Sequence, residues 1–283
     1  MNDEIMAMLE NLSDSQKKPE SEYLGEDGLL HCSVCHEPTQ TRRECFGTVK
    51  TFRCVCNCER KKREAMKARE EQEEIERKRM ICFGGTNMDS WCFENDDHSN
   101  PELSKIGRNY VKNFREFLNE GKGLLLYGSV GSGKTYISAC IANSLISDGY
   151  SVLMTNFGRI VNQMQGTFSE KQNVLESLNR YSLLVLDDLG AERSTEYMQE
   201  MVYNIVDWRY RSGKPMIVTT NLTGEQMKAT DNIQLQRIYD RIFERCLPIE
   251  VNGMSRRKQK LAAGAADMRR KLGIRKEYEC RKG

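Results

Sequence analysis

Short apolar runs alternate with helical periods through the middle and later part of the chain. The runs are nearly unbroken and rich in Leu, Val, Ile and Thr, which is typical of strands buried on both faces of a parallel sheet. Between them apolar residues recur every three or four positions, as at Ile106, Tyr110 and Phe114 before the first run. Strands that alternate with helices predict an α/β domain with right-handed crossovers. The predicted strands are residues 124–127, 152–155, 183–186, 216–220 and 247–251.

A highly charged stretch precedes this pattern. Of the 21 residues from 59 to 79, 16 are charged and none is Gly or Pro. Opposite charges stand four positions apart, as in Glu73 and Arg77, and this spacing places them side by side on a helix. We therefore expect an exposed helical linker over 59–79, with a small domain before it at 1–58 and a larger domain after it at 80–257.

The composition excludes a membrane-spanning chain. The 283 residues are 39% hydrophobic and 30% charged, with a mean hydropathy of −0.65, and no apolar run approaches the roughly 18 residues that a bilayer requires. Met1 to Glu10 mixes acidic with apolar residues, unlike a secretory signal. Eleven cysteines without such a signal favour a reducing compartment. We expect a cytoplasmic protein with no membrane partner.

The net charge of +2 is unevenly distributed. Residues 254–283 hold eleven Lys or Arg and three Asp or Glu, so the rest of the chain is net negative. The basic C-terminal tail, 258–283, is either a solvated terminus or a contact for nucleic-acid phosphates, and both interpretations stay open.

A phosphate-binding motif follows the first predicted strand. Residues 128–135, GSVGSGKT, match the pattern GxxxxGK[ST] and lead directly into a predicted helix over 136–146. Glycines let such a loop curl until backbone N–H groups face an anion, and the helix amino terminus adds its positive dipole end. Lys134 is expected to face solvent and reach the β- and γ-phosphates, and Thr135 to ligate Mg²⁺. The predicted nucleotide-binding residues are Gly128, Ser129, Val130, Gly131, Ser132, Gly133, Lys134, Thr135 and Tyr136.

Polar residues follow the next strands at the same edge of the sheet. Asp187 suits a Mg²⁺ ligand acting through water, and Asp188 is placed to polarise an attacking water. Glu192 is less favoured because a Leu-Gly turn intervenes. Asn221 ends the fourth strand, where its amide would hold the water or the γ-phosphate. Since no NKxD or TKxD sequence is present to recognise guanine, we expect an adenine nucleotide.

Arginines recur every four residues at Arg237, Arg241 and Arg245, which places them on one helix face. They form either a solvated surface or a source of an arginine for the γ-phosphate of a neighbouring subunit.

A cysteine cluster has metal-ligand spacing. Cys32 and Cys35 form a CxxC pair, and Cys54, Cys56 and Cys58 follow about twenty residues later. Four thiolates suit a closed structural zinc site, and a segment of this length cannot bury enough surface to fold without one. Because the spacing offers five thiols for four positions, it leaves the choice open.

Five motifs in one order resemble the DnaC/DnaI-type replicative helicase loaders and their IstB-like relatives, which are AAA+ proteins. They are GSVGSGKT between strand and helix, LLVLDDLGAE, IVTTN, QRIYDRI and GMSRR, and the resemblance covers roughly residues 80–257. It implies a P-loop AAA+ three-layer domain with a parallel sheet of order 5-1-4-3-2, preceded by a zinc-binding domain. It also implies ATP binding and assembly into an oligomer with ATP between subunits.

Matched by position, the resemblance assigns further roles. Asn221 corresponds to the first sensor, Arg241 to the arginine finger with Arg237 beside it, and Arg257 to the second sensor. Asp188 stands where Glu is usual, and a second arginine at 256 blurs the sensor assignment.

For zinc, the resemblance to loaders with a CxC sequence favours Cys56 and Cys58 as partners of Cys32 and Cys35. Cys54 is the alternate.

The implied function is ATP-dependent loading of a hexameric replicative helicase onto single-stranded DNA, with ATP, Mg²⁺ and Zn²⁺ bound. ATP hydrolysis is expected to be weak and stimulated by the partner or by single-stranded DNA. Two alternatives stay open: an IstB-like ATPase that regulates the choice of transposition target, and a nucleotide-binding adaptor that hydrolyses little.

Overall fold

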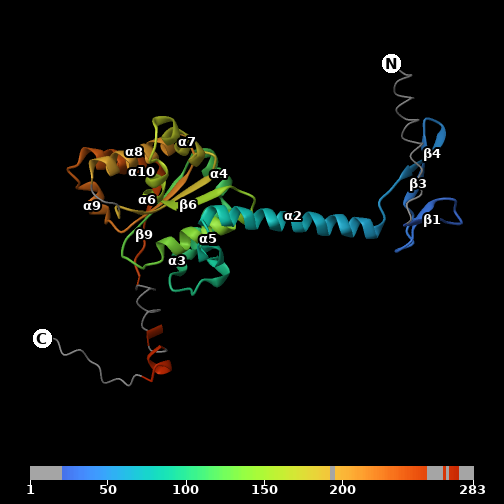
Figure 1. The fold of residues 1–283 in the computed structure, drawn as a ribbon, viewed down its shortest axis with the longest axis horizontal. Helices are drawn as coiled ribbons and strands as arrows, with labels where there is room; N and C mark the ends of the chain where they lie inside the picture. The colour runs from blue at the N-terminus through green and yellow to red at the C-terminus, as the bar shows by residue number, and fades with distance from the viewer. Residues whose placement is uncertain (1–20, 192–194, 254–263, 266–267, 274–283) are drawn as a thin grey trace, which may run out of the picture. The chain divides into compact units, whose positions relative to one another are not determined.

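The computed structural model describes residues 21–191, 195–253, 264–265 and 268–273. By its internal contacts the chain divides into two compact units, Met1–Glu74 and Ile75–Gly283, and Figure 1 labels many of their helices and strands. None of the helices in the described ranges is both long and apolar enough to cross a membrane. The predicted roles of Glu192, Arg256 and Arg257, and most of the basic tail, fall outside the described residues.

The first unit contains two small antiparallel hairpins. They are formed by β1 (Glu22–Leu24) with β2 (Leu30–Cys32), and by β3 (Gln40–Cys45) with β4 (Thr48–Arg53). Phe46 and Gly47 connect β3 to β4 with φ values of +52° and +76°, the type I′ geometry that matches the twist of paired strands. Every residue of β4 is exposed, so the second hairpin has a strand that is buried on neither face.

The helix predicted over 59–79 is confirmed as part of α2 (Asn57–Phe83). Ion pairs four residues apart line its exposed surface, such as that between Arg63 and Glu59 at 2.9 Å; each contributes a few tenths of a kcal/mol at about 25 °C. The last turn of α2 differs, because Cys82 and Phe83 are buried in the core of the second unit.

The second unit is built on a five-stranded parallel sheet. Its order is β6-β7-β8-β5-β9, which in chain order is 2-3-4-1-5 and confirms the predicted arrangement. The strands are β5 (Gly123–Tyr127), β6 (Val152–Asn156), β7 (Leu183–Leu189), β8 (Met216–Thr220) and β9 (Cys246–Glu250).

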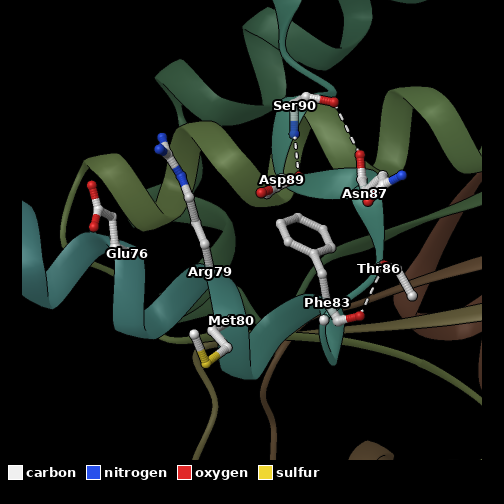
Figure 2. A pocket seen from close by; sticks show the side chains of 9 residues that line it. Glu76, Arg79, Met80, Phe83, Thr86, Asn87, Asp89 and Ser90 are labelled. Atoms are coloured by element: carbon white, nitrogen blue, oxygen red, sulfur yellow. Dashed lines mark hydrogen bonds between the residues drawn. The ribbon is translucent and has the colours of Figure 1, made fainter.

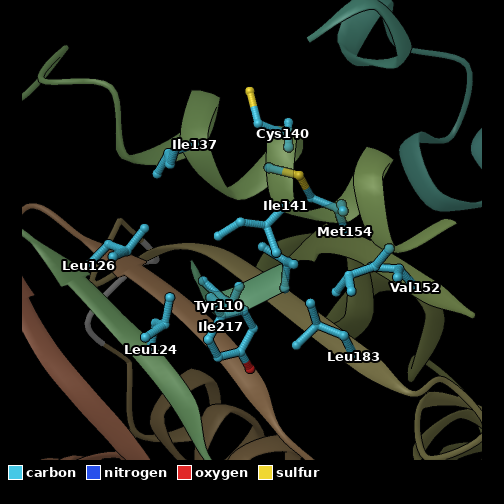
Figure 3. Close-up of a cluster of buried hydrophobic side chains, with 14 of the residues drawn as sticks. Tyr110, Leu124, Leu126, Ile137, Cys140, Ile141, Val152, Met154, Leu183 and Ile217 are labelled. Atoms are coloured by element: carbon cyan, nitrogen blue, oxygen red, sulfur yellow. The ribbon is translucent and has the colours of Figure 1, made fainter. Parts of the chain in front are cut away.

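Helices cover both faces of this sheet, as the predicted three-layer architecture requires. Successive strand residues point to opposite faces, so Leu124 and Leu126 join the core beneath α5 while Leu125 joins the core on the other side. Figure 3 shows the first of these cores. The remaining elements are the 3₁₀ helices η1 (Asn87–Ser90) and η2 (Phe93–Asn95), and α3 (Pro101–Lys112), α4 (Phe114–Glu120), α5 (Lys134–Ser147), α6 (Phe157–Gln163), α7 (Phe168–Leu178), α8 (Glu196–Arg211), α9 (Gly224–Lys228) and α10 (Ile233–Arg245).

One predicted helix is divided in two. The apolar period that starts at Ile106 crosses Asn113, whose backbone (φ −103°, ψ 15°) ends α3 and begins α4. The side chain of Asn113 donates back to the carbonyl of Asn109 at 3.0 Å. Asparagine side chains compete in this way with the backbone hydrogen bonds of a helix. The apolar period of the sequence therefore continues past Asn113, although the helix itself is interrupted there.

A buried arginine ties the amino ends of two central strands together. Arg209 of α8 is 1% exposed, and its guanidinium donates to the carbonyls of Leu178, Tyr181, Ser182 and Pro215. Burial lowers the pKa of this guanidinium to about 10. Because a buried charge is tolerated only when it is well hydrogen-bonded, these four carbonyls are the reason that Arg209 can occupy the core.

Candidate functional site

The loop after β5 has the backbone of a phosphate cradle. Gly128, Gly131 and Gly133 have φ values of +131°, +82° and +104°, which residues with a Cβ rarely adopt. A Cβ on Gly128 would also lie 2.6 Å from the carbonyl oxygen of Val251. Within the described residues, the buried hydroxyl of Ser132 has no hydrogen-bond partner. A curled loop with a buried polar group before a helix amino terminus fits a phosphate group.

Lys134 is held inside this loop. Its Nζ donates to the carbonyls of Gly128 and Ser129 at 2.9 and 2.8 Å, and to Oδ1 of Asn221 at 2.9 Å. The residue is 5% exposed, so the expectation of a solvent-facing side chain is wrong. The loop curls around the ammonium and supplies acceptors that the sequence pattern does not reveal. This contact brings the ends of β5 and β8 together, and with them Lys134 and Asn221.

A second junction joins α5, β7 and β8. The hydroxyl of Thr135 donates to Oδ1 of Asp187 at 3.1 Å, and the hydroxyl of Thr219 donates to the same oxygen at 2.6 Å. Thr219 is fully buried and was not singled out by sequence reasoning, because a threonine inside a strand is ordinary. The signal that marks it is its place two residues before Asn221 on the strand beside the Asp-Asp pair.

Strand β7 is irregular at its two aspartates. The pairing of β7 with β8 shifts register between Leu186 and Leu189, and Asp188 has a φ of +58°. The backbone N–H of Asp188 donates to the hydroxyl of Thr219 at 2.9 Å. A side-chain acceptor on β8 thus takes the place of a backbone carbonyl in the pairing of the two strands. A non-glycine residue in this conformation costs about 1–2 kcal/mol. The bulge is therefore a costly feature located at the candidate site, and bulges of this kind are common beside functional groups.

The environment of Asp187 raises the pKa of its carboxyl above the ordinary value. Burial raises the pKa of its carboxyl and the charge of Asp188 raises it further, while the hydrogen bond from Thr219 lowers it. A divalent cation would reverse this balance, since it stabilises the ionised carboxylate. Carboxylate and hydroxyl oxygens are ligands that Mg²⁺ accepts, so Asp187 and Thr135 fit such an ion.

The side chains of other residues in the predicted nucleotide-binding set lie apart from these contacts. Ser129 and Val130 are exposed on the outer part of the loop. Tyr136 donates its hydroxyl to the carbonyl of Cys92 at 3.0 Å and packs beside Trp91. Its side chain thus joins α5 to the segment that contains η1 and η2.

The two candidate arginines of α10 differ in their surroundings. Arg241 donates to Asp207 at 2.6 Å and to the hydroxyl of Tyr203 at 2.8 Å, and its guanidinium lies 4.7 Å from the ring centre of Tyr203. Arg237 is exposed, and in the described part of the chain its side chain has no polar partner. In the described part of the chain, the polar and ring contacts of Arg241 are all with α8 and with its own helix, and none is with this chain's own phosphate loop.

Four cysteines come together in the first unit. The sulfur atoms of Cys32, Cys35, Cys56 and Cys58 all lie within 4.8 Å of one another. Sulfur atoms around a tetrahedral zinc ion would be about 3.8 Å apart, from Zn–S bonds of about 2.3 Å, so the set fits zinc. Cys54 lies outside this group and donates its thiol to the carbonyl of Pro38 at 3.3 Å.

The cluster already favours one thiolate. Hydrogen bonds from the backbone of Cys58 and Glu37 lower the pKa of Cys35 to about 6, whereas the side chain of Cys35 raises the pKa of Cys58 to about 12. Crowded thiols therefore resist full deprotonation by themselves. A cation of charge +2 would stabilise all four thiolates, and this chemistry is the reason that such a donor set suits zinc.

A surface pocket of about 500 Å³ lies elsewhere in the second unit (Figure 2). It contains no residue of the phosphate loop. The guanidinium of Arg79 donates to the hydroxyl of Ser147 on α5 at 3.0 Å, and charges of both signs line the cavity, so the lining selects no class of ligand. The lining residues are Glu76, Arg79, Met80, Phe83, Gly85, Thr86, Asn87, Asp89 and Ser90.

Comparison with known families gives a match over most of the second unit. The model of the family described as IstB-like ATP binding protein matches residues 86–263. This range includes the phosphate loop, the Asp-Asp pair, Asn221 and the candidate arginines Arg237 and Arg241 of α10, and it begins after the cysteine cluster.

Two curated relatives are replicative helicase loaders. DnaI of Bacillus subtilis (strain 168) is 29% identical over 181 residues, which cover 58% of this chain and 58% of that protein. DnaC of Escherichia coli (strain K12) is 31% identical over 144 residues, which cover 50% of this chain and 56% of that protein. The chain thus spans little more than half the length of either relative. A crystal structure of DnaI matches 64% of this chain and 99% of its own, with 25% identity and a TM-score of 0.50.

Proposed function

Because the chain belongs to the IstB-like ATP-binding protein family, we propose that it is an ATP-dependent loader of a hexameric replicative helicase onto single-stranded DNA. The observation that carries the proposal is the junction of Lys134 with Asn221 and of Thr135 with Asp187. This junction joins the phosphate loop to the ends of β7 and β8 in a chain whose relatives include DnaI and DnaC. A cytoplasmic location stays a prediction that rests on the cysteine-rich composition.

In this proposal the phosphate loop holds the nucleotide by its backbone N–H groups. Lys134 exchanges its carbonyl acceptors for β- and γ-phosphate oxygens while Asn221 keeps the ammonium oriented. Thr135 would ligate Mg²⁺ and Asp187 would do so through water, and the ion when bound would neutralise charge on the phosphate oxygens. Asp188 follows Asp187 in a strained backbone conformation, and its carboxylate would accept a proton from the water that attacks the γ-phosphorus, releasing ADP and phosphate.

We assign the arginine finger to Arg241 of a neighbouring subunit, with Arg237 beside it. The contacts of Arg241 on α8 support a role outside its own loop, and an arginine supplied in this way increases hydrolysis by about 10³ to 10⁵. Hydrolysis would then be weak in the monomer and rise on assembly, on binding the helicase or on binding single-stranded DNA. Arg257 is proposed as the second sensor.

We assign contact with the helicase to the first unit, held in its fold by zinc at Cys32, Cys35, Cys56 and Cys58. The support is the compact sulfur cluster in a unit that lies outside the matched ATPase segment. A regulator of transposition that shares the ATPase segment has no need of such a unit.

The test is light-scattering chromatography of the full chain with a hexameric replicative helicase, with and without ATP. We expect a complex whose stability depends on ATP, and the Lys134→Ala variant is expected to lose that dependence. Absence of a complex under both conditions, together with ATP-dependent oligomers on DNA, would instead support the transposition regulator. Complex formation with no hydrolysis above that of an Asp188→Ala variant would support the adaptor.

A further inference from the structure

The two faces of the second hairpin of the first unit differ in whether their arginine and lysine side chains have polar partners. Arg42 and Arg53 share one face, since residues two apart on a strand point to the same side and Arg42 pairs with Thr51 while Arg53 pairs with Gln40. Arg53 forms an ion pair with Glu22 at 2.7 Å, and Arg42 donates to the carbonyl of Gly28 at 3.3 Å. The cations of this face are thus held by the segments around β1.

The opposite face holds two cations without partners. Arg43 and Lys50 are directly paired across β3 and β4. Both are exposed, and within the described residues neither has an ion pair or a hydrogen bond from its side chain. Like charges directly opposite each other destabilise a hairpin. An anionic ligand placed across this pair would convert the repulsion into attraction.

Aromatic side chains flank the cation pair. Phe52 pairs with Thr41 on the same face, next to Arg43 and Lys50, and is 42% exposed. Phe46 forms the turn and is completely exposed. No contact within the described residues uses its ring.

The turn is an unfavourable place for phenylalanine. With a φ of +52°, Phe46 occupies a position of the type I′ turn that Asn, Asp or Gly adopt at lower cost. In the described residues the Phe46 ring makes no contact that would stabilise the turn. We therefore explain its presence by a contact with another molecule.

We propose that this face of the β3–β4 hairpin, together with the turn that ends it, binds single-stranded nucleic acid, with bases stacked on Phe46 and Phe52 and phosphates held by Arg43 and Lys50. Exposed aromatic rings interleaved with cations are the pattern by which proteins bind single strands without sequence preference. An apolar protein surface is less suited to this face, because it would bury both cations unpaired. The inference rests on the hairpin alone and extends the proposed function by locating a DNA contact outside the ATPase unit.

The experiment measures the binding of a fluorescent oligothymidylate to the full chain, without ATP, over a range of salt concentrations. Phe46→Asn places a favoured residue in the turn, so the variant folds at least as well as the parent. We expect its affinity to fall about fivefold or more, because stacking of one base is lost. Arg43→Gln with Lys50→Gln removes a repulsive pair and is expected to reduce the slope of log K against log salt by about 1.4, at about 0.7 per phosphate contact.

Arg42→Gln on the opposite face is the matched control, and its salt slope is expected to stay close to that of the parent. Unchanged affinity and slope in both hairpin variants would overturn the proposal. Loss of helicase co-elution with unchanged DNA affinity would also overturn it and assign the face to a protein. If no helicase complex forms with the parent, but the variants lose DNA affinity, the hairpin site stands and the loader function fails.

Discussion

Arg241 and Asp207 form a close ion pair between α10 and α8, with 2.6 Å between Nε and Oδ1. The other carboxylate oxygen of Asp207 accepts from Arg211 at 2.8 Å. Both partners of the Arg241 pair are mostly shielded from water, so this contact is stronger than a surface ion pair. The candidate arginine finger is therefore a fixed side chain whose position Asp207 determines.

Asp207→Asn is expected to lower the free energy of unfolding by about 1–2 kcal/mol, because charge-assisted hydrogen bonds to two arginines become weaker. Hydrolysis in the assembled state is expected to fall as well, since Arg241 loses its fixed position. Urea unfolding and steady-state hydrolysis measure the two effects. Asp240→Asn, at an exposed position of α10 next to Arg241, is the control and should change neither. An unfolding free energy equal to that of the parent would contradict the role given to Asp207.

Lys134→Ala is expected to abolish ATP binding and also to destabilise the loop. The three oxygens that Lys134 satisfies would lose a charged donor, which costs about 1–3 kcal/mol. Asn221→Ala removes one acceptor at an exposed position, so it should retain ATP binding while hydrolysis falls. Titration with a fluorescent ATP analogue, followed by thermal unfolding, separates the two variants. Normal ATP binding by Lys134→Ala would refute the assignment of the loop.

Asp187→Asn is expected to keep the fold and lose Mg²⁺-dependent hydrolysis. The amide oxygen still accepts from Thr135 and Thr219, and the cost of burying a charge beside Asp188 disappears. Since the folded-state pKa of Asp187 is raised, the parent loses stability as the pH rises from about 4 through that pKa. The melting temperature of the variant relative to the parent should therefore increase over the same interval and then level off. A relative melting temperature that falls with rising pH would show that the carboxylate stabilises the fold.

Cys58→Ser is expected to remove zinc, whereas Cys54→Ser should keep about one zinc ion per chain. The two cysteines are four residues apart, and only Cys58 belongs to the sulfur cluster. Metal analysis of the purified variants measures the difference, and circular dichroism of the full chain follows the fold. Equal zinc content in both variants would mean that a different set of cysteines binds the metal.

Much of the architecture could be predicted because its signals are local. The phosphate loop, the apolar strands and the charged helix each occupy one short stretch. The strand order was implied by the resemblance to helicase loaders, and it is the observed one. The burial of Lys134 was missed because the motif does not reveal that the loop turns the carbonyls of Gly128 and Ser129 toward the ammonium, and because the third acceptor, on Asn221, lies 87 positions away. Thr219 was missed for the same reason, since its role depends on Asp187, which is 32 positions away. A sequence pattern over a short stretch cannot predict contacts between residues that only the folding of the sheet brings together.

Arg209 has a consequence for how the sheet responds to its ligand. The carbonyls that it binds precede β7 and β8, whereas Asp187 and Asn221 lie at the opposite ends of these strands. The central strands are thus clamped at one end and carry the reactive groups at the other. Adjustments of the phosphate loop would therefore be confined to the carboxyl ends of the strands, and the clamped ends would keep the strand register constant through a cycle of nucleotide binding and release.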